Sequence, residues 1–424
     1  MTHLIRRTAA WLLLSTVASV VHAQGGAGER RVASDVAFLA SDRLEGRFTG
    51  SNGAREASAY IADAFKRAGL TPGVNGAWFQ EFPVSPNAPA LHGTGLGAEG
   101  GLTGRNVVAV LPGRDPVLRA EAVVIGAHYD HLGNGTFGAR DSASRGQIHN
   151  GADDNASGTA TLLEAARILR DKPPRRTVVF VAFAGEELGL LGSDAYVKHA
   201  ILPIDRTVAM INLDMVGRLR EGRLMALGAE TAVEFPALLD SLNRSAGFQL
   251  RASGDGYGAS DHQSFYLAKR PVIHLFTDLH EDYHRPSDDT ETLNTAGMAR
   301  IAQFTADLAR AIADRPTPLT LVDRPRPTPI AGGGGYDTWL GTIPDMTGGG
   351  PGVRLSGVGR GSPAETAGIQ AGDVLLRIGT HDVPDLQAMT NALRAHKPGD
   401  TVAVVVRRGE RLDTLRTVLG RRGG

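Results

Sequence analysis

The chain has 424 residues, with 45 Lys plus Arg and 45 Asp plus Glu, so its formal net charge is zero. Domains typically have roughly 100–200 residues, so the length of this chain predicts two or three domains. The balanced charge gives no indication of nucleic acid or an anionic membrane as a partner. The chain contains no cysteine. This excludes disulfides, thiolate zinc sites and cysteine nucleophiles, so a metal site must use His, Asp or Glu.

The first residues have the pattern of a secretory signal peptide. Arg6 and Arg7 precede a short, mostly apolar stretch at 9–21, and residues 21–23 (VHA) form a small-residue cleavage site. A membrane anchor is the alternative, but this stretch falls short of the roughly 20 apolar residues that span a bilayer. We therefore expect residues 1–23 to be removed on export to the periplasm or the medium, with no stable membrane anchor.

The next part of the chain alternates between predicted helices and strands. Residues 35–70 are expected to be largely helical, because their apolar side chains recur at helical spacing. Five later runs are rich in Val and Ile and nearly continuous, which is typical of strands buried on both faces. These runs are Asn106–Leu111, Glu121–Ala127, Thr177–Phe183, Val208–Leu213 and Pro271–Phe276. The predicted amphipathic helices are Thr159–Leu169, Phe235–Ala246 and Ala296–Ile312. The alternation predicts an α/β fold with a mixed, mostly parallel sheet flanked by helices on both faces.

The composition changes after Ala313. Residues 314–335 contain five prolines and end in four consecutive glycines, which is typical of a linker. The segment 336–422 is predicted to hold short strands around one helix, Asp385–Ala395, in a small α+β domain. We therefore expect a large domain at 24–313, a linker at 314–335 and a small domain at 336–422.

Five segments of the large domain place imidazole or carboxylate side chains where an apolar run ends. Ligands of open α/β sheets bind beyond the carboxyl ends of the strands, so these side chains are expected to converge. Each segment alone has an ordinary explanation, such as a polar loop, a solvated helix start or a helix N-cap. Together they supply enough ligands for two divalent metal ions, with one carboxylate left over. The residues concerned are His128 and Asp130, Asp154, Glu186 and Glu187, Asp214, and Tyr283 and His284.

In this order, the five segments resemble the co-catalytic zinc exopeptidases, which include secreted bacterial leucyl aminopeptidases and glutamate carboxypeptidases. The resemblance covers most of residues 30–313 and includes the stretch 47–50 (RFTG). It implies two metal sites that share one bridging carboxylate, next to a cis peptide bond. The implied ligands are His128 and Asp214 for one ion, Glu187 and His284 for the other, and Asp154 for both, with the cis bond at Asp154–Asn155.

The residue types fit hydrolytic metal chemistry. Imidazole and carboxylate suit zinc, with Co²⁺ or Mn²⁺ as substitutes, and we expect two Zn²⁺ per chain. Two ions about 3.5–4 Å apart lower the pKa of a water between them and polarise the scissile carbonyl. Glu186 is next to a ligand but is not one, so it is the expected general base, which passes the proton of that water to the leaving amine. Asp130 is expected to accept the second ring N–H of His128, and Tyr283 to donate a hydrogen bond to the oxyanion.

The C-terminal segment resembles a PDZ domain of the bacterial type. The residues that carry the resemblance are Ser362-Pro363-Ala364, Ala367-Gly368-Ile369 and Gly372-Asp373-Val374, whose spacing fits a short helix, a glycine turn and a strand. PDZ domains bind chain ends by adding a strand to a sheet edge. The resemblance places the carboxylate-binding loop at 339–343, where the polar Thr342 replaces a commonly hydrophobic residue. We expect a peptide or protein C-terminus as partner, and a spacer or dimerisation module is the alternative.

These observations predict an exported dinuclear zinc aminopeptidase followed by a PDZ-like domain, with peptides as substrates. The protease-associated insertion of several relatives has no room between Gly73 and Glu121, which favours an open rim and an aminopeptidase. Two other interpretations remain. A glutaminyl cyclase-like acyltransferase resembles this layout but uses one metal ion, and the presence of both His128 and Asp214 argues against it. A non-catalytic, metal-containing peptide-binding protein is the other, and it would have no use for Glu186.

Overall fold

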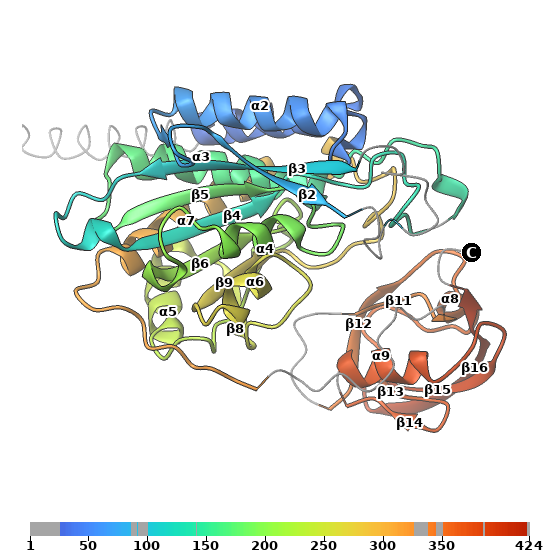
Figure 1. The fold of residues 1–424 in the computed structure, drawn as a ribbon. Coiled ribbons are helices and arrows are strands. Elements are labelled where there is room, and N and C mark those ends of the chain that lie inside the picture. The colour runs from blue at the N-terminus through green and yellow to red at the C-terminus, as the bar shows by residue number, and fades with distance from the viewer. Residues whose placement is uncertain are drawn as a thin grey trace, which may run out of the picture.

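The structure is a computed structural model that describes residues 26–85, 91, 101–140, 142–325, 338–344, 351–384 and 386–421. The predicted signal peptide and residues 326–335 of the predicted linker lie outside the described residues. The described part comprises a large α/β unit and a smaller, mainly antiparallel unit near the C-terminus (Figure 1). None of the described helices is both long and apolar enough to cross a membrane.

The large unit is built on a mixed sheet with the strand order β1-β3-β5-β4-β6-β9-β7-β8, in which β2 pairs with β3. The four central strands β5, β4, β6 and β9 run parallel, whereas β3 and β7 are antiparallel to their central neighbours. The strands are β1 (Thr71–Pro72), β2 (Phe79–Val84), β3 (Leu102–Leu111), β4 (Ala122–His128), β5 (Thr177–Phe183), β6 (Thr207–Leu213), β7 (Arg223–Leu227), β8 (Gln249–Ser253) and β9 (Val272–Phe276). The predicted mixed sheet is confirmed, and all five predicted strands belong to it. Its parallel part is limited to the centre and to the β7–β8 pair.

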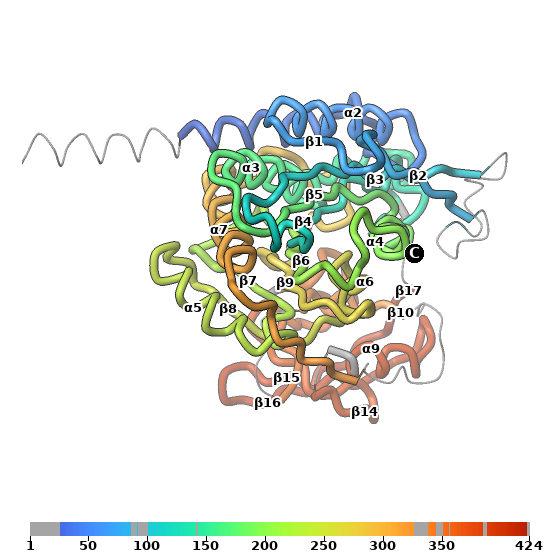
Figure 2. Tube along the Cα trace, turned by 60° about the vertical axis from the view of Figure 1, so that its left-hand side comes forward, coloured from blue at the N-terminus to red at the C-terminus, as the bar shows by residue number. Residues whose placement is uncertain are grey.

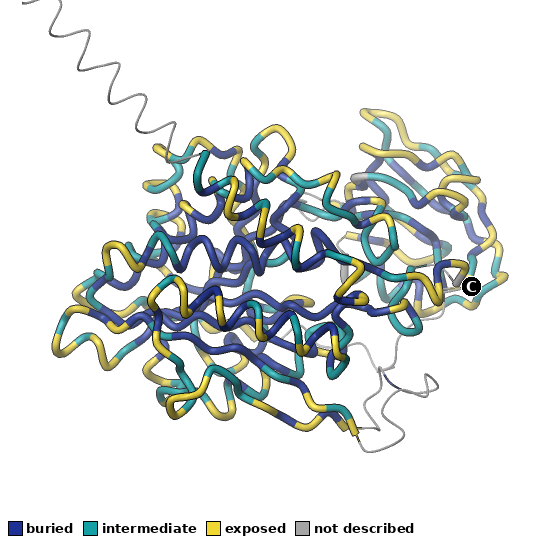
Figure 3. The backbone as a smooth tube through the Cα atoms, turned by 90° about the horizontal axis from the view of Figure 1, so that it is seen from above, coloured by how far each residue is buried: buried dark blue, intermediate teal, exposed yellow. Residues whose placement is uncertain are grey.

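Every residue of β4, β5 and β6 is buried. Alternate side chains enter different cores: Val123 and Ile125 pack into one cluster, and Val124 packs into the other on the opposite face. Apolar residues are therefore needed at consecutive positions, which explains why these strands show no polar alternation. Figure 3 shows this layering, with buried strands inside and exposed residues along the outer helices.

Helices cover both faces of the sheet (Figures 1 and 2). One face packs against α2 (Asn52–Arg67), α3 (Gly158–Asp171) and α7 (Thr295–Ala313), and α5 (Phe235–Ala246) packs beside α7. The other face packs against α4 (Leu191–Lys198) and α6 (His262–Leu267). Residues 26–39 are also helical. The shorter helical segments are η1 (Asp42–Arg47), η3 (Leu118–Ala120), η4 (Ser142–Ser144), η5 (Ala152–Ser157), η6 (Ile204–Arg206) and η7 (Thr290–Thr292).

The C-terminal unit has its own hydrophobic core. Its main sheet has the order β11-β12-β13-β15-β16, with β14 paired to β13, and β10 pairs separately with β17. The elements are β10 (Thr338–Trp339), β11 (Thr342–Pro344), β12 (Val353–Val358), α8 (Pro363–Thr366), β13 (Val374–Ile378), β14 (His381–Asp382), α9 (Leu386–Arg394), β15 (Thr401–Arg408), β16 (Arg411–Val418) and β17 (Gly420–Arg421). The predicted helix is α9, and the small α+β fold is confirmed.

Candidate metal centre and active site

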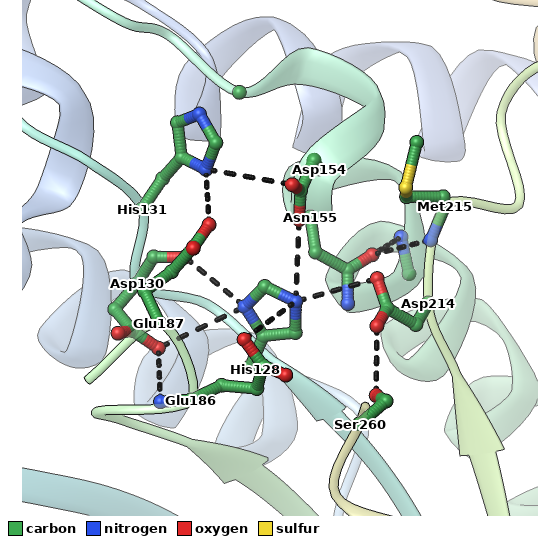
Figure 4. A network of polar contacts seen from close by, with 12 residues as sticks. His128, Asp130, His131, Asp154, Asn155, Glu186, Glu187, Asp214, Met215 and Ser260 are labelled. Atoms are coloured by element: carbon green, nitrogen blue, oxygen red, sulfur yellow. Dashed lines mark hydrogen bonds and ion pairs between the residues drawn. The ribbon is translucent and has the colours of Figure 1, made fainter. Parts of the chain in front are cut away.

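The candidate site residues come together at the carboxyl ends of the central strands. His128 is the last residue of β4, and Asp214 directly follows β6. Glu186 and Glu187 follow β5, while His284 lies in the loop after β9. Figure 4 shows the side chains from β4, from the loop after β5 and from the end of β6 pointing toward one another. The structure thus places the sequence-predicted residues at one edge of the sheet.

Two donor sets share the carboxylate of Asp154. Its Oδ1 lies 3.3 Å from His128 Nε2, which is also 3.3 Å from Asp214 Oδ1. Its Oδ2 lies 3.2 Å from His284 Nε2, which is 3.3 Å from Glu187 Oε2. Zinc–ligand distances of about 2.0–2.2 Å in a tetrahedral site place ligand atoms roughly 3.3–3.6 Å apart. Both sets therefore have the spacing and the chemistry that zinc ligands require.

Both histidines are oriented by main-chain carbonyls. His284 Nδ1 donates to the carbonyl of Gly138 at 2.9 Å, and His128 Nδ1 donates to the carbonyl of Asp130 at 3.1 Å. These bonds leave Nε2 of each ring facing the shared Asp154 carboxylate. The Asp130 carboxylate, which the sequence suggested for this role, is farther from His128 Nδ1, at 3.8 Å. It accepts instead from the Glu186 N–H at 3.2 Å and from Thr49 Oγ1 at 2.8 Å.

The Asp154–Asn155 peptide bond is cis, as predicted. The side chain of Asn155 ties this turn to the end of β6: its Nδ2 donates to the carbonyl of Leu213, and its Oδ1 accepts from the N–H of Met215. Two further N–H groups, those of Asp153 and Asp154, donate to the carboxylate of Asp288. The backbone on both sides of the bridging carboxylate is therefore held by hydrogen bonds.

Glu186 lies beside the first donor set, and its carboxylate is within 4.8 Å of the ligand atoms of His128 and Asp214. Its Oε2 is 4.0 Å from His128 Nε2, longer than the 3.3 Å that separates this nitrogen from its two neighbours. The Glu186 side chain is 11% exposed. Burial raises the pKa of this carboxyl well above its ordinary value, and the carboxylates of Glu187 and Asp214 raise it further against the opposing effect of His128. A carboxyl with this placement suits proton transfer rather than coordination.

His131 is a site residue that the sequence analysis did not single out. Its Nδ1 lies 2.7 Å from Glu187 Oε1, a hydrogen-bond distance that is too short for two ligands of one ion, and the ring is fully buried. It therefore orients Glu187. Ser260 plays the same part for Asp214, because its Oγ donates to Asp214 Oδ2 at 2.7 Å. His131 follows the same predicted strand as His128, but its partner Glu187 lies 56 residues away in the chain, so the sequence does not pair them.

A cavity of about 610 Å³ opens over the metal-site residues. One side is apolar and is lined by Met215, Leu227, Phe276 and Leu279. Tyr283 also lines it and stacks on His284, with ring centroids 3.9 Å apart. Burial raises the pKa of Tyr283 well above its ordinary value, so its hydroxyl stays protonated and can donate. His262 lies in the wall of the cavity and stacks on His274 at 4.6 Å.

Comparison with known families decides what the two units are. Residues 106–309 match the model of peptidase family M28, and residues 339–419 match that of the PDZ domain. The chain carries an M28 peptidase domain followed by a PDZ domain. The resemblance inferred from the five segments and from the C-terminal spacing is thereby confirmed, and the antiparallel C-terminal unit is the PDZ domain.

Known relatives of the M28 domain carry aminopeptidase names. The chain is 28% identical over 231 residues to aminopeptidase YwaD of Bacillus subtilis (52% of this chain, 47% of the relative). It is 31% identical over 235 residues to leucine aminopeptidase 1 of Trichophyton rubrum (48% of this chain, 58% of the relative). The chain thus spans about half the length of the curated relatives it matches.

Solved structures share the fold of the M28 domain. A leucine aminopeptidase precursor from Bacteroides thetaiotaomicron has a TM-score of 0.55 at 17% identity and covers 66% of this chain and 96% of its own. The zinc aminopeptidase BSAP from Bacillus subtilis has a TM-score of 0.53 at 18% identity, covering 66% of this chain and 94% of its own. At these identities the likeness concerns the fold.

Proposed function

We propose that this chain is a zinc-dependent aminopeptidase that holds two Zn²⁺ and hydrolyses the N-terminal peptide bond of peptides. The observation that carries the proposal is Glu186, a nearly buried carboxylate whose Oε2 lies farther from His128 Nε2 than the carboxylates of Asp154 and Asp214 do. The residues that would hold the metal are His128, Asp154 and Asp214 for one ion and Asp154, Glu187 and His284 for the other. When bound, such ions polarise the scissile carbonyl and lower the pKa of water.

Glu186 would act as the general base. It would take a proton from the attacking water and hand it to the nitrogen of the leaving group, as the peptide bond breaks. Its position is fixed by the hydrogen bond from its own N–H to Asp130 Oδ1. Because the Glu186 side chain is nearly buried, the transferred proton is kept from bulk solvent.

Tyr283 would stabilise the developing negative charge. Its ring lines the cavity and is held against His284, and its hydroxyl remains a donor because its pKa is raised. A preorganised donor at the scissile carbonyl acts most strongly on the transition state.

The cavity favours an apolar N-terminal residue in the substrate. Met215, Phe276 and Leu279 line its wall next to Asp214, and burial of an apolar side chain there contributes about 25 cal/mol per Å² removed from water. The leucine aminopeptidases among the relatives carry a name consistent with this preference.

Two alternatives are less well supported. A glutaminyl cyclase from Bacteroides thetaiotaomicron shares the fold, with a TM-score of 0.53 at 16% identity. The two complete donor sets of this chain favour a dinuclear hydrolase over a cyclase that uses one metal ion. A non-catalytic peptide-binding protein would leave Glu186 without a role.

The same proposal extends to location and domain limits. The signal-like sequence at 1–23 supports export to the periplasm or the medium. We place the peptidase domain at 24–313, the linker at 314–335 and the PDZ domain at 336–422. Peptide substrates and a peptide C-terminus are the partners that we assign, and Co²⁺ or Mn²⁺ would be substitutes for Zn²⁺.

The proposal is tested with a panel of aminoacyl p-nitroanilides, assayed before chelation, after chelation and after restoration of zinc. We expect leucine and methionine derivatives to be preferred, activity to vanish with chelator, and two zinc ions per active chain by elemental analysis. One metal ion per chain, together with conversion of glutaminyl peptides into products lighter by one ammonia, would identify a cyclase instead.

A further inference from the structure

The PDZ domain lines the same cavity as the metal centre. The cavity of about 610 Å³ over Glu186 and His284 is also bordered by Leu340, Thr342, Met389 and Leu393 of the PDZ domain. In Figure 1 the PDZ domain lies at the end of the molecule toward which the loop after β4 projects. The two functional surfaces therefore face one another across one space.

The part of the PDZ domain that faces the cavity is the part that the sequence resemblance expects to bind peptides. The loop 339–343, which the sequence assigned to carboxylate binding, is in the cavity wall. Its last two residues already belong to β11, the edge strand of the main sheet, and residues of α9 line the same cavity. Thr342 of β11 and Met389 of α9 are in contact, with Oγ1 and Sδ 4.0 Å apart. PDZ domains hold an extended chain end between such a strand and helix.

The size of the shared space indicates a small occupant. A volume of about 610 Å³ lies within the range of roughly 300–1,000 Å³ typical of small-ligand sites. An extended peptide advances about 3.3–3.6 Å per residue. In a cavity of about 610 Å³, only a peptide of a few residues therefore fits with both of its ends inside. The proposed aminopeptidase activity requires the N-terminus of that peptide at the metal centre.

We propose, on the basis of the proposed function, that one short peptide occupies both sites at once. Its N-terminal residue lies at the metal centre, and its free C-terminal carboxylate lies in the loop 339–343 of the PDZ domain. The PDZ domain then selects the substrate: it favours short peptides with a free C-terminus over long chains and over peptides with a blocked end.

The kinetic consequence follows from where the carboxylate binds. The PDZ contact is far from the reacting bond and holds substrate and transition state equally, so it lowers KM and leaves kcat unchanged. A hydrogen bond to a charged group contributes enough to change binding about tenfold. Peptides too long to keep both ends in the cavity lose this contribution.

The first experiment compares substrates on the unaltered full-length chain. Leu-Gly-Gly and its C-terminal amide are assayed together with leucine p-nitroanilide and with leucyl-glycine peptides of increasing length. We expect amidation to raise KM about tenfold with kcat within about twofold, and kcat/KM to fall beyond a short optimal length. Equal KM values for acid and amide would overturn the inference. Hydrolysis of leucine p-nitroanilide reports separately on the proposed function, since it has no carboxylate.

The second experiment determines which domain binds the C-terminal carboxylate of the peptide. Thr390→Trp fills the cavity from α9, and Thr401→Trp, at an exposed position outside the cavity, is the matched control. We expect Thr390→Trp to abolish the difference in KM between acid and amide while the zinc content of the chain stays at the level of the unaltered chain. The control should behave as the unaltered chain. A preference for the acid that survives Thr390→Trp would place the carboxylate on the peptidase side, where Arg140 also lines the cavity, and would overturn the inference.

Discussion

The carboxylate of Asp288 accepts a hydrogen bond from the backbone N–H of Asp154 at 3.0 Å. Asp288 is fully buried and lies four residues after His284, so one short loop supplies both a candidate ligand and the support of the shared carboxylate. It also accepts from the N–H of Asp153 and pairs with Arg218 at 3.2 Å. The position of Asp154 thus depends on a residue that belongs to neither donor set.

Asp288→Asn should weaken metal binding at both sites. The amide removes the charge that holds two N–H groups and the Arg218 guanidinium, and loss of such a support typically costs 10–100-fold in metal affinity. Zinc titration in competition with a chromogenic chelator measures the loss. Asp289→Asn is the matched control, because the side chain of this neighbour accepts from the N–H of Thr290 in its own turn. Unchanged zinc affinity in Asp288→Asn would contradict this account of the loop.

His131→Gln should affect one site more than the other. His131 orients Glu187, which belongs to the donor set of His284, so we expect that set to lose metal first, with affinity lowered about 10–100-fold. Elemental analysis after dialysis should give about one zinc per chain instead of two. The exposed His199 provides the control variant His199→Gln, which should keep both. Equal loss from both sites, or none, would show that His131 does not act through Glu187.

Metal binding should become stronger as the pH rises. Burial lowers the pKa of His128 and His284, but the surrounding carboxylates outweigh it and hold both values well above the ordinary one in the metal-free protein. A metal ion binds neutral imidazole, so it must displace protons from these rings. Zinc affinity is therefore lost as the pH falls below the raised values. Calorimetry in buffers of different ionisation enthalpy should detect proton release, and binding without it would contradict the expected charge state.

Tyr283→Phe should lower kcat with little change in KM, because the hydroxyl is expected to act on the transition state. Loss of one such donor costs about 10²–10³ in kcat. The ring remains to stack on His284, so metal content should stay at the level of the unaltered chain. Tyr257→Phe is a suitable control in the same cavity, since its hydroxyl donates to the carbonyl of Arg324. If kcat is unchanged in Tyr283→Phe, the tyrosine has only a packing role.

Much of the fold could be predicted because the central strands are buried on both faces. The continuous apolar runs of β4, β5 and β6 follow directly from this burial. By contrast, β8 lies at the end of the sheet and is mostly exposed, so its sequence carries no comparable pattern. Its partner β7 is only five residues long. Short or exposed strands such as β7 and β8 therefore cannot be predicted from a continuous apolar run.

The candidate site divides in the same way. Glu187 and His284 could be selected from their positions after predicted strands and from a family resemblance. His131 and Asp288 could not, because their roles depend on atoms that only the folded chain brings within hydrogen-bond distance. The shared cavity depends on how two domains are placed, which local sequence patterns do not contain.

Glu186→Gln tests the central claim most directly. The amide keeps the size of the side chain but cannot accept a proton from water, and Glu221→Gln, at a side chain that is 77% exposed, is the control. We predict that Glu186→Gln retains two zinc ions per chain. Its kcat for leucine p-nitroanilide should fall by about 10²–10⁴-fold, the usual contribution of a general base. Turnover near that of the unaltered chain, or loss of a zinc ion with the activity, would contradict the assignment of Glu186 as the base that binds no metal.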